Sequence, residues 1–305
     1  MLIGATTSQL DIPLLTPDIH MPMTEPAAPT ATQKIASRKP QLAWWIAAFC
    51  GLFILALFLD IPVSTWVHDH HISSTLKNHQ RITLAIRLPG RFPFTLICCA
   101  ALLLVELRRF HPRWPQMSDD AMMLRIAVML SLINWLLPEL FFVVAIIACA
   151  ALIFRDVRRH HLRWPQFGRD AAILFLAGVL SGVNWILKWC FGRIRPFHDS
   201  PPFALHPFRG GWQGLLLSEQ NLSFPSGDVS IAFASAACLA MIVPSYRRLW
   251  WTLGIIVILE RIAEGAHYPS DTVAAAALGI AVAPLARKIV QRMIQSAQPG
   301  TTIHD

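Results

Sequence analysis

The sequence predicts an all-α fold, a polytopic membrane helical bundle of about eight transmembrane helices. The first observation is composition: hydrophobic residues are 54% of the 305 residues and charged residues 14%, where a soluble domain carries about 25% charge. The second is a series of long apolar runs, and the third is a set of short basic clusters between them. A mean hydropathy of +0.48 argues against a disordered chain, a coiled coil and an ordinary cytosolic enzyme.

The apolar runs follow a polar N-terminal segment. Residues 1–40 are rich in Pro and Thr and are expected to form a disordered cytoplasmic tail. A spanning helix needs about 20 residues, and runs near that length cover 42–59, 92–107, 121–137, 139–154, 171–189, 229–243, 249–262 and 272–290. We predict one transmembrane domain over 41–292 and a cytoplasmic tail over 293–305.

Basic residues orient the predicted spans. Lys and Arg cluster before the first run and after the second, fourth, sixth and eighth. Eight spans put every cluster on one side, which the positive-inside rule makes cytoplasmic. Segments 62–91, 190–228 and 260–271 then face outward, although 62–91 carries basic residues, including Arg87, that run against the pattern. Without a signal-peptide pattern, this arrangement fits a bacterial inner membrane, with both termini cytoplasmic.

An internal repeat precedes the polar motifs. Residues 99–137 align with 149–187 at a constant offset of 50, and the Arg-Trp-Pro-Gln sequence at 113–116 recurs at 163–166. The copies diverge just past the repeat, where Pro138 corresponds to Lys188. We interpret this as a duplicated unit of helix end, basic loop and next helix. Only the second copy is expected to deliver chemistry.

Polar residues gather in three short segments that the predicted topology places on the extracytoplasmic face. Lys188, Arg195 and Arg261 are able to surround one phosphate, because Arg bonds phosphate oxygens bidentately and Lys supplies a compact charge. Ser226 and Gly227 stand just before an apolar run, where the free N–H groups and dipole of a helix start favour an anion. Together these residues predict a phosphate-binding site.

His267 is the candidate nucleophile, with Asp271 four residues further on. A carboxylate can hold imidazole in the right tautomer and raise its basicity. Attack on phosphorus would form a phosphohistidine that water then cleaves. The surrounding cations would stabilise the charge of the transition state.

The order and spacing of these residues resemble the three signature motifs of the type-2 phosphatidic acid phosphatase family, over about 190–275 and the helices around it. The resemblance implies a helical-bundle core whose outer phosphate site is shared with vanadium-dependent haloperoxidases, and phosphatase action without a metal or cofactor. It implies that His267 is the nucleophile and Asp271 its partner, within a catalytic part at 188–271. The residues that would bind phosphate are Lys188, Arg195, Ser226, Gly227 and Arg261.

Two positions depart from the family pattern. The second motif usually ends in a histidine that protonates the leaving group, and here that residue is Asp228. Nearby cations favour its ionised form, whereas burial and a bound phosphate dianion favour the protonated form. An ionised Asp228 suits a leaving group that needs little protonation, and the family's lipid A phosphatase branch also tends to an acidic residue here. The third motif usually begins with serine, and here Glu260 stands there, able to orient Arg261. His198 and His206 are alternative acids.

The sequence therefore predicts an integral membrane lipid phosphatase that hydrolyses a lipid phosphomonoester or diphosphate at the extracytoplasmic face through a phosphohistidine. The expected partners are the lipid phosphate and the bilayer, with undecaprenyl diphosphate and lipid A as candidate substrates. We expect no nucleic-acid partner, cofactor or metal, and the oligomeric state is not predicted. Two alternatives stay open: a lipid phosphotransferase with the same site, and a non-catalytic phospholipid-binding protein.

Overall fold

The structure is a computed structural model that describes residues 31–108, 118–136, 166–196, 204–208 and 221–296. The chain divides into two compact units, Met1–Ile46 and Ala47–Asp305. Within the first unit the described residues, 31–46, are helical. The second unit holds all of the predicted site residues.

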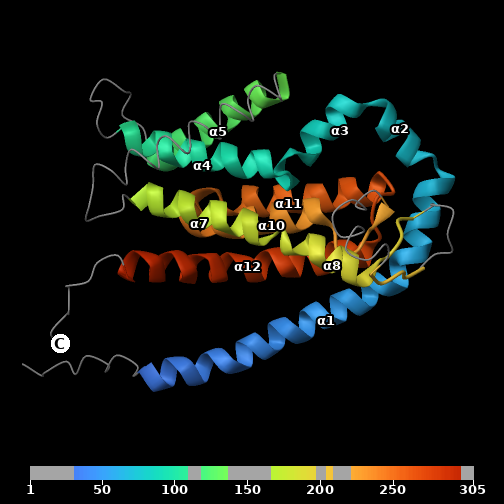
Figure 1. Cartoon of the computed structure of the whole chain (residues 1–305), viewed down its shortest axis with the longest axis horizontal. Coiled ribbons are helices and arrows are strands. Elements are labelled where there is room, and N and C mark those ends of the chain that lie inside the picture. The colour runs from blue at the N-terminus through green and yellow to red at the C-terminus, as the bar shows by residue number, and fades with distance from the viewer. Residues whose placement is uncertain (1–30, 109–117, 137–165, 197–203, 209–220, 297–305) are drawn as a thin grey trace, which may run out of the picture. The chain divides into compact units, whose positions relative to one another are not determined.

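Helices make up most of the described chain, and the all-α prediction is confirmed there (Figure 1). Two isolated β-bridges, Arg193–Leu205 and Ile194–Leu222, are the extended pairings among the described residues. The predicted tail and the structure differ at residues 31–40, which belong to the first helix, while residues 1–30 lie outside the described chain. The helices are α1 (Ala31–Asp69), α2 (Ile72–Asn78), α3 (Gln80–Arg87), η1 (Leu88–Gly90), α4 (Phe92–Arg108), α5 (Asp119–Leu136), α7 (Gln166–Leu180), α8 (Val183–Phe191), α10 (Gly227–Ile242), η3 (Pro244–Tyr246), α11 (Arg247–Ala263) and α12 (Pro269–Ser296).

Three helical segments are long and apolar enough to cross a membrane: Ala43–Asp69, Gly168–Phe191 and Pro269–Ser296. A fourth candidate is the pair Arg81–Gly90 and Phe92–Val105, which is bent by 63°. α10 is apolar but has only 16 residues. Eight spans are therefore not confirmed in the part of the chain that is described, and the predicted run 139–154 lies outside it. The apolar helices nevertheless indicate an integral membrane protein.

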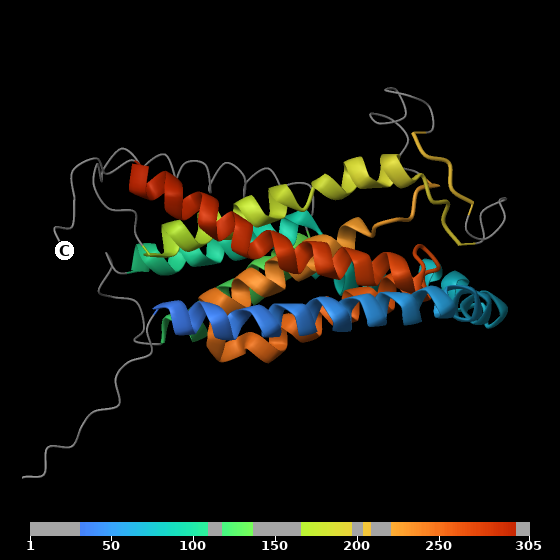
Figure 2. The same cartoon turned by 90° about the horizontal axis from the view of Figure 1, so that it is seen from below.

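α10 is the central helix of the second unit, where it packs against α12, α11, α7 and η1 (Figures 1 and 2). Small side chains let its neighbours approach closely. A Cβ at Gly279 of α12 would lie 2.4 Å from Ser230 O and 2.8 Å from Ala234 N, so α12 passes almost directly over the backbone of α10. This contact holds together the two helices whose N-termini begin in the predicted site.

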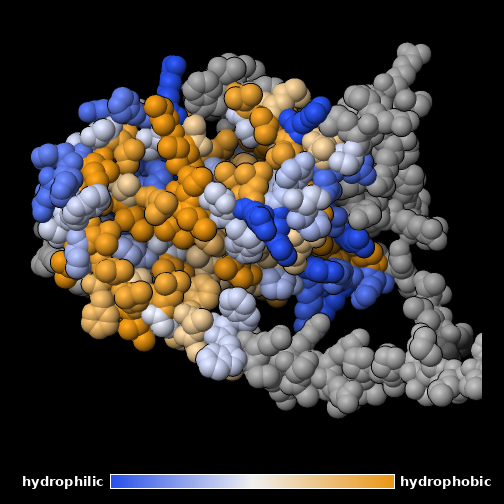
Figure 3. Space-filling model, turned by 180° about the vertical axis from the view of Figure 1, so that it is seen from behind, coloured by the Kyte–Doolittle hydropathy of each residue, from blue (hydrophilic) through white to orange (hydrophobic). Residues whose placement is uncertain are grey.

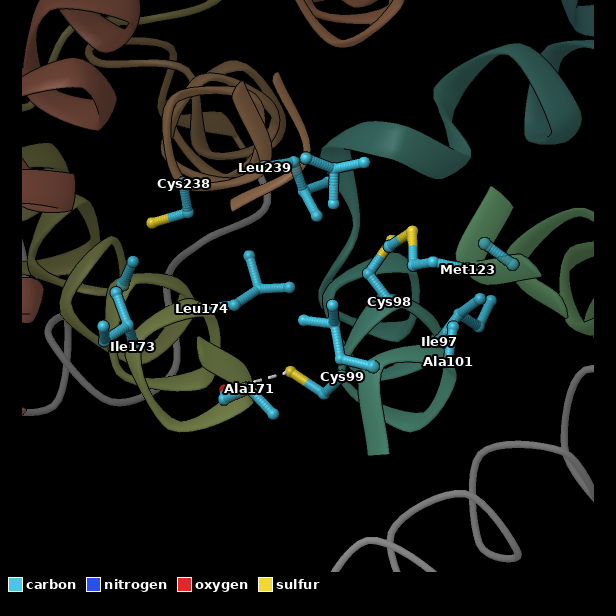
Figure 4. Packing of buried hydrophobic residues seen from close by; sticks show 14 of the residues in the cluster. Ile97, Cys98, Cys99, Ala101, Met123, Ala171, Ile173, Leu174, Cys238 and Leu239 are labelled. Atoms are coloured by element: carbon cyan, nitrogen blue, oxygen red, sulfur yellow. Dashed lines mark hydrogen bonds between the residues drawn. The ribbon is translucent and has the colours of Figure 1, made fainter. Parts of the chain in front are cut away.

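A larger apolar core lies further from the site, between α4, α5, α7 and α10 (Figure 4). Ile97 and Cys98 of α4 face Met123 of α5, while Cys99 Sγ donates a hydrogen bond to Ala171 O over 3.4 Å. The described cysteines are free thiols: Cys50, Cys98, Cys99, Cys190 and Cys238. Cys149 lies outside the described residues.

Large apolar side chains also cover much of the outer surface. On α1 the exposed positions include Leu55, Phe58 and Leu59, and Phe58 is 76% exposed. Figure 3 shows one face of the molecule, on which apolar residues form a broad band between more hydrophilic regions. An apolar surface of this extent suits contact with lipid rather than with water.

The two copies of the internal repeat fold differently where both are described. α5 continues unbroken past Ser131 and Leu132, whereas the second copy turns at Ser181 and Gly182 and restarts as α8. Gly182 replaces the leucine of the first copy, and glycine is poorly suited to a helix interior. Elsewhere in the repeat at least one copy lies outside the described residues, which leave out 109–117 and 137–165.

The close approach at Gly279 predicts the effect of a substitution there. Gly279→Ala places a methyl group against the backbone of α10, which cannot move as a flexible side chain can, and we expect a loss of about 1–3 kcal/mol of stability. The midpoint of thermal unfolding in detergent measures it. Gly51→Ala is the matched control, because no atom lies within 4 Å of a Cβ there. Equal midpoints for the two variants would contradict the predicted packing.

Candidate active site

Three segments that are far apart in sequence meet at one end of α10. The first follows α8, the second precedes α10 and the third precedes α12, and both ribbon views show them at the same end of these helices. Arg195 N–H donates to Asn221 O over 3.1 Å, which joins the first segment to the second. Ser226 N–H donates to Asp271 O over 3.3 Å, which joins the second to the third. The structure thus brings the predicted segments together.

His267 lies among these segments and is only 4% exposed. Its Nδ1 is 2.8 Å from Ser223 O. Because a carbonyl oxygen can only accept a hydrogen bond, Nδ1 carries the proton, and in the neutral ring Nε2 then keeps its lone pair. The backbone of the second segment therefore sets the tautomer of this histidine.

Burial and the neighbouring cations favour the neutral ring of His267. Burial lowers the pKa of His267 well below its ordinary value. The positive charges of Lys188, Arg261 and Arg195 lower this pKa further. The carboxylate of Asp228 acts in the opposite direction with a smaller effect. At neutral pH the side chain is accordingly an unprotonated base surrounded by three cations, which is the charge distribution that a phosphate-binding nucleophile needs.

The end of α8 sets the positions of two of these cations. Lys188 is 5% exposed and lies in the last turn of α8. The helix ends at Gly192, whose φ of 58° is left-handed. A Cβ at Gly192 would lie 1.9 Å from His206 O, so only glycine fits this end. Just beyond it, Arg195 Nε donates to Leu222 O over 3.5 Å.

The start of α10 supplies a buried hydroxyl. Ser226 is the N-cap residue, has no exposed surface, and its Oγ has no hydrogen-bond partner in the described part of the chain. Gly227 leaves room for Asn184, whose Nδ2 would lie 3.2 Å from a Cβ there. Asn184 Nδ2 in turn donates to Ser230 Oγ over 3.0 Å and ties α8 to α10. An unsatisfied hydroxyl at a helix N-terminus suits an anion oxygen.

Asp228 lies in the first turn of α10 and pairs with one of the predicted phosphate ligands. Its Oδ2 accepts a hydrogen bond from Arg261 Nη1 over 3.2 Å and lies 3.9 Å from Arg87 Nε. The carboxyl group therefore serves as an ion-pair partner in this structure. Its role as the acid stays a prediction. Of the alternative acids, His206 is exposed and His198 lies outside the described residues.

Arg87 of α3 forms a charge network beside the site. Its guanidinium donates to Glu260 Oε1 over 2.9 Å and 3.2 Å, and to Glu264 Oε2 over 2.5 Å. Arg261 also donates to Glu264. The sequence suggests that Glu260 orients Arg261, but its Oε2 lies 3.7 Å from Arg261 Nη1 and Glu264 is the closer partner. Arg87, which runs against the predicted inside-positive pattern, thus pairs with two carboxylates beside the site.

Asp271 does not make the direct hydrogen bond to His267 that the sequence predicts. Its Oδ2 lies 3.8 Å from His267 Nδ1, whose hydrogen bond goes to a carbonyl instead. Asp271 Oδ2 accepts from Tyr268 N–H over 2.9 Å, and its Oδ1 accepts from Arg193 Nη1 over 2.7 Å. The carboxylate therefore holds the loop that carries the histidine, and its catalytic role remains a prediction.

Two buried residues of this site are absent from the sequence-based set. Arg193 Nη2 donates to Asp60 Oδ2 of α1 over 2.8 Å, and the two side chains are 5% and 0% exposed. Asp60 carries a signal in the sequence, since an ionisable residue within an apolar span is a functional candidate. Arg193 gives a weaker signal, two residues before the predicted ligand Arg195.

No group of three or more His, Cys, Asp or Glu side chains suited to a metal ion occurs among the residues searched, which are those that the structure describes. The acidic side chains nearest the site are engaged by guanidinium groups, as at Glu260 and Asp271. The guanidinium groups give this part of the structure the positive charge that an anionic ligand needs.

Comparison with known proteins gives a partial match. Residues 170–295 match the PAP2 superfamily. Two curated relatives, from Rhizobium johnstonii and Rhizobium etli, both carry the name Lipid A 1-phosphatase and are 38% identical over 94 residues, or 30% of this chain. The chain spans only 36% and 38% of the lengths of these relatives. No solved structure is significantly similar to the chain.

The matched region covers most of α7 and α12 and all of α8, α10, η3 and α11, and it contains every residue of the predicted site. The three motifs that suggest the family in the sequence are also the segments that meet around His267. The chain therefore carries a PAP2 superfamily domain at residues 170–295.

Proposed function

We propose that this protein is a membrane lipid phosphatase that cleaves a lipid phosphomonoester or diphosphate through a phosphohistidine at His267. The observation that carries the proposal is the hydrogen bond from His267 Nδ1 to Ser223 O over 2.8 Å. It leaves the Nε2 lone pair available on a neutral ring that lies among the three cations. The PAP2 match and the two curated relatives support the same reaction class.

The first chemical step would form a bond from His267 Nε2 to phosphorus while the bond from phosphorus to the lipid oxygen breaks. Lys188, Arg195 and Arg261 would hold the phosphoryl oxygens and stabilise the charge that they carry in the transition state. The Ser226 hydroxyl and the N-terminus of α10 supply further donors. As the ring becomes cationic, its Nδ1–H strengthens the bond to Ser223 O.

The second step would transfer the phosphoryl group from Nε2 to water, releasing inorganic phosphate and restoring the neutral ring. The lipid oxygen leaves in the first step as an alkoxide, a phosphate or an anomeric oxygen, according to the substrate. Asp228 stands where the related motif has its acid, but it accepts a hydrogen bond from Arg261. This pairing favours a leaving group that departs with little protonation.

The 1-phosphate of lipid A meets that requirement, because its leaving oxygen is attached to the anomeric carbon of a sugar. The relatives from Rhizobium are named for this phosphate. We therefore propose a glycosidic lipid phosphate such as lipid A 1-phosphate as the substrate class, ahead of a simple phosphatidate. A polyprenyl diphosphate, which leaves as a phosphate, is the next candidate.

The distribution of charge supports an extracytoplasmic site in a bacterial inner membrane. Basic residues gather at the ends of α11 and α12 that lie away from His267, namely Arg247, Arg248, Arg287, Lys288 and Arg292. The positive-inside rule assigns that end to the cytoplasm. The headgroup would then reach the site from the opposite face, with its acyl chains in the bilayer.

Replacing the nucleophile tests the enzyme proposal. Purified His267→Ala should release no inorganic phosphate above background, because no other group forms the phosphoenzyme. The assay uses lipid A, undecaprenyl diphosphate, phosphatidylglycerophosphate and phosphatidate in detergent. Phosphate transfer to an acceptor lipid without free phosphate would indicate a phosphotransferase. If wild type and variant both release phosphate only at the background rate on every lipid, the enzyme proposal is wrong and the non-catalytic phospholipid-binding alternative remains.

Substitutions at Asp228 separate its two roles. If the carboxyl group is not the acid, Asp228→Asn should retain activity on lipid A within about tenfold, whereas loss of general acid catalysis costs about 10²–10⁴-fold. Asp228→His should raise activity on phosphatidate, whose leaving alkoxide needs a proton. Full activity of Asp228→Asn on every substrate would exclude the acid role altogether, and a loss above a hundredfold on lipid A would restore it.

The acid side of the pH profile reports the charge state of His267. Its pKa lies well below the ordinary 6.5, so the ring stays neutral, and kcat/KM should hold, as the pH falls to 6.5. A phosphate monoester itself titrates at about pH 6, and a decline at or below that value agrees with the prediction. A decline that begins above about pH 7 would show a histidine that is protonated too easily for this mechanism.

A further inference from the structure

We infer that Asp60 of α1 is a positioning residue of the proposed phosphatase site and acts on His267 through Arg193 and the start of α12. The inference rests on the proposed function, since it assigns a role in that reaction. Asp60 lies outside the region 170–295 that matches the PAP2 superfamily. It would make α1 part of the site.

Asp60 is bound on both carboxylate oxygens. Its Oδ1 accepts from Ser270 N–H over 2.8 Å, while its Oδ2 accepts from Ser270 Oγ over 2.5 Å and from Arg193 Nη2 over 2.8 Å. Asp60 and Ser270 have no exposed surface. Ser270 is the second residue of α12, so the carboxylate holds the first turn of that helix at a fixed distance from α1.

Arg193 connects this contact to the loop that carries the histidine. Its Nη1 donates to Ser270 Oγ and to Asp271 Oδ1, each over 2.7 Å. Its guanidinium carbon lies 4.0 Å from the centre of the Tyr268 ring, within range of a cation–π interaction. Tyr268, Ser270 and Asp271, which these contacts join to Arg193, lie within four residues after His267 in the sequence.

The backbone of Arg193 reaches the histidine by a second route. Arg193 O accepts from Ser223 N–H over 2.7 Å, and Ser223 O accepts from His267 Nδ1. A displacement of Arg193 would thus move both the carbonyl that fixes the tautomer and the loop that holds the ring. A misplacement of about 1 Å can cost about 10²-fold in rate.

The role of Asp60 follows from the division of one guanidinium between two carboxylates. Asp60 takes Nη2 and Asp271 takes Nη1. Without the charge of Asp60, Arg193 is expected to turn and bind Asp271 with both nitrogen atoms, because the bidentate pair is the stronger arrangement. That turn would pull Asp271 and the adjoining loop away from the position that the reaction needs.

A buried ion pair that only supports folding would look similar in the structure, so the experiment separates rate from folding. Asp60→Asn keeps the size of the side chain and removes its charge. We expect kcat per folded, monodisperse enzyme to fall about 10²-fold, while KM for lipid A stays within about threefold, because the phosphate ligands are untouched. A structural role alone would lower the yield or the melting temperature and leave kcat per folded enzyme unchanged.

Ser64→Ala is the matched control, since Ser64 lies one turn further along α1 and is buried. In the described part of the chain its hydroxyl bonds backbone carbonyls alone, those of Asp60 and Ile61, and makes no hydrogen bond to the Asp60 carboxylate. It should keep the wild-type kcat. Arg193→Lys retains the charge but lacks the planar fork and should lose kcat to a similar extent. The double variant with Asp60→Asn should lose little more than either single variant, as expected for residues that act as a unit.

Ser270→Ala keeps the inference testable if Asp60→Asn does not fold, because it removes only the hydroxyl that links the two side chains. We expect a loss of about tenfold in kcat for it. Wild-type kcat per folded enzyme in the variants that fold would overturn the inference while the phosphatase proposal stands. An inactive wild type would instead overturn the phosphatase proposal.

Discussion

The single hydrogen bond between His267 Nδ1 and Ser223 O decides what the rest of the site is able to do. It determines which nitrogen carries the proton, and therefore which nitrogen keeps the lone pair that the proposed reaction uses. A backbone carbonyl is a better anchor than a side chain for this purpose, because it has no rotamers. The carbonyl is itself held by the hydrogen bond from its own N–H to Arg193 O, so the segment after α8 supports the tautomer.

Two charge networks lie around this bond, and they differ in how deeply they are buried. The network of Arg193 is fully buried and contains two carboxylates, Asp60 and Asp271. The network of Arg87 and Arg261 lies nearer the surface, where Asp228 has 29% of its side chain exposed. Burial makes unpaired charge costly, so the inner network is suited to holding parts in place. The outer network is more open and is suited to exchanging a carboxylate for a phosphate.

Much of the site could be predicted from the sequence, because its motifs are short and local. The boundaries of the apolar runs predicted that Ser226, Gly227 and Lys188 lie near helix ends. The basic clusters predicted that all three lie on one face of the membrane. The structure brings these segments together, while the catalytic roles remain predictions. The contact of Asp60 with Arg193 could not be predicted in the same way, since the two residues are 133 positions apart and no local pattern links them. The count of eight spans is not confirmed in the described residues, because α10 and α11 have only 16 and 17 residues and the predicted run 139–154 lies outside them.

The position of Asp60 has a consequence for how far the matched region can stand alone. Residues 170–295 contain the three motifs, yet the inner guanidinium shares its charge with a carboxylate from a helix more than a hundred residues earlier in the chain. A transplanted version of that region would bring Arg193 without its second counter-charge. Under the proposed role of Asp60, the three motifs alone do not provide the complete charge arrangement of the site. A shortened or chimaeric form of this protein would then need an acidic group in the place that Asp60 of α1 occupies.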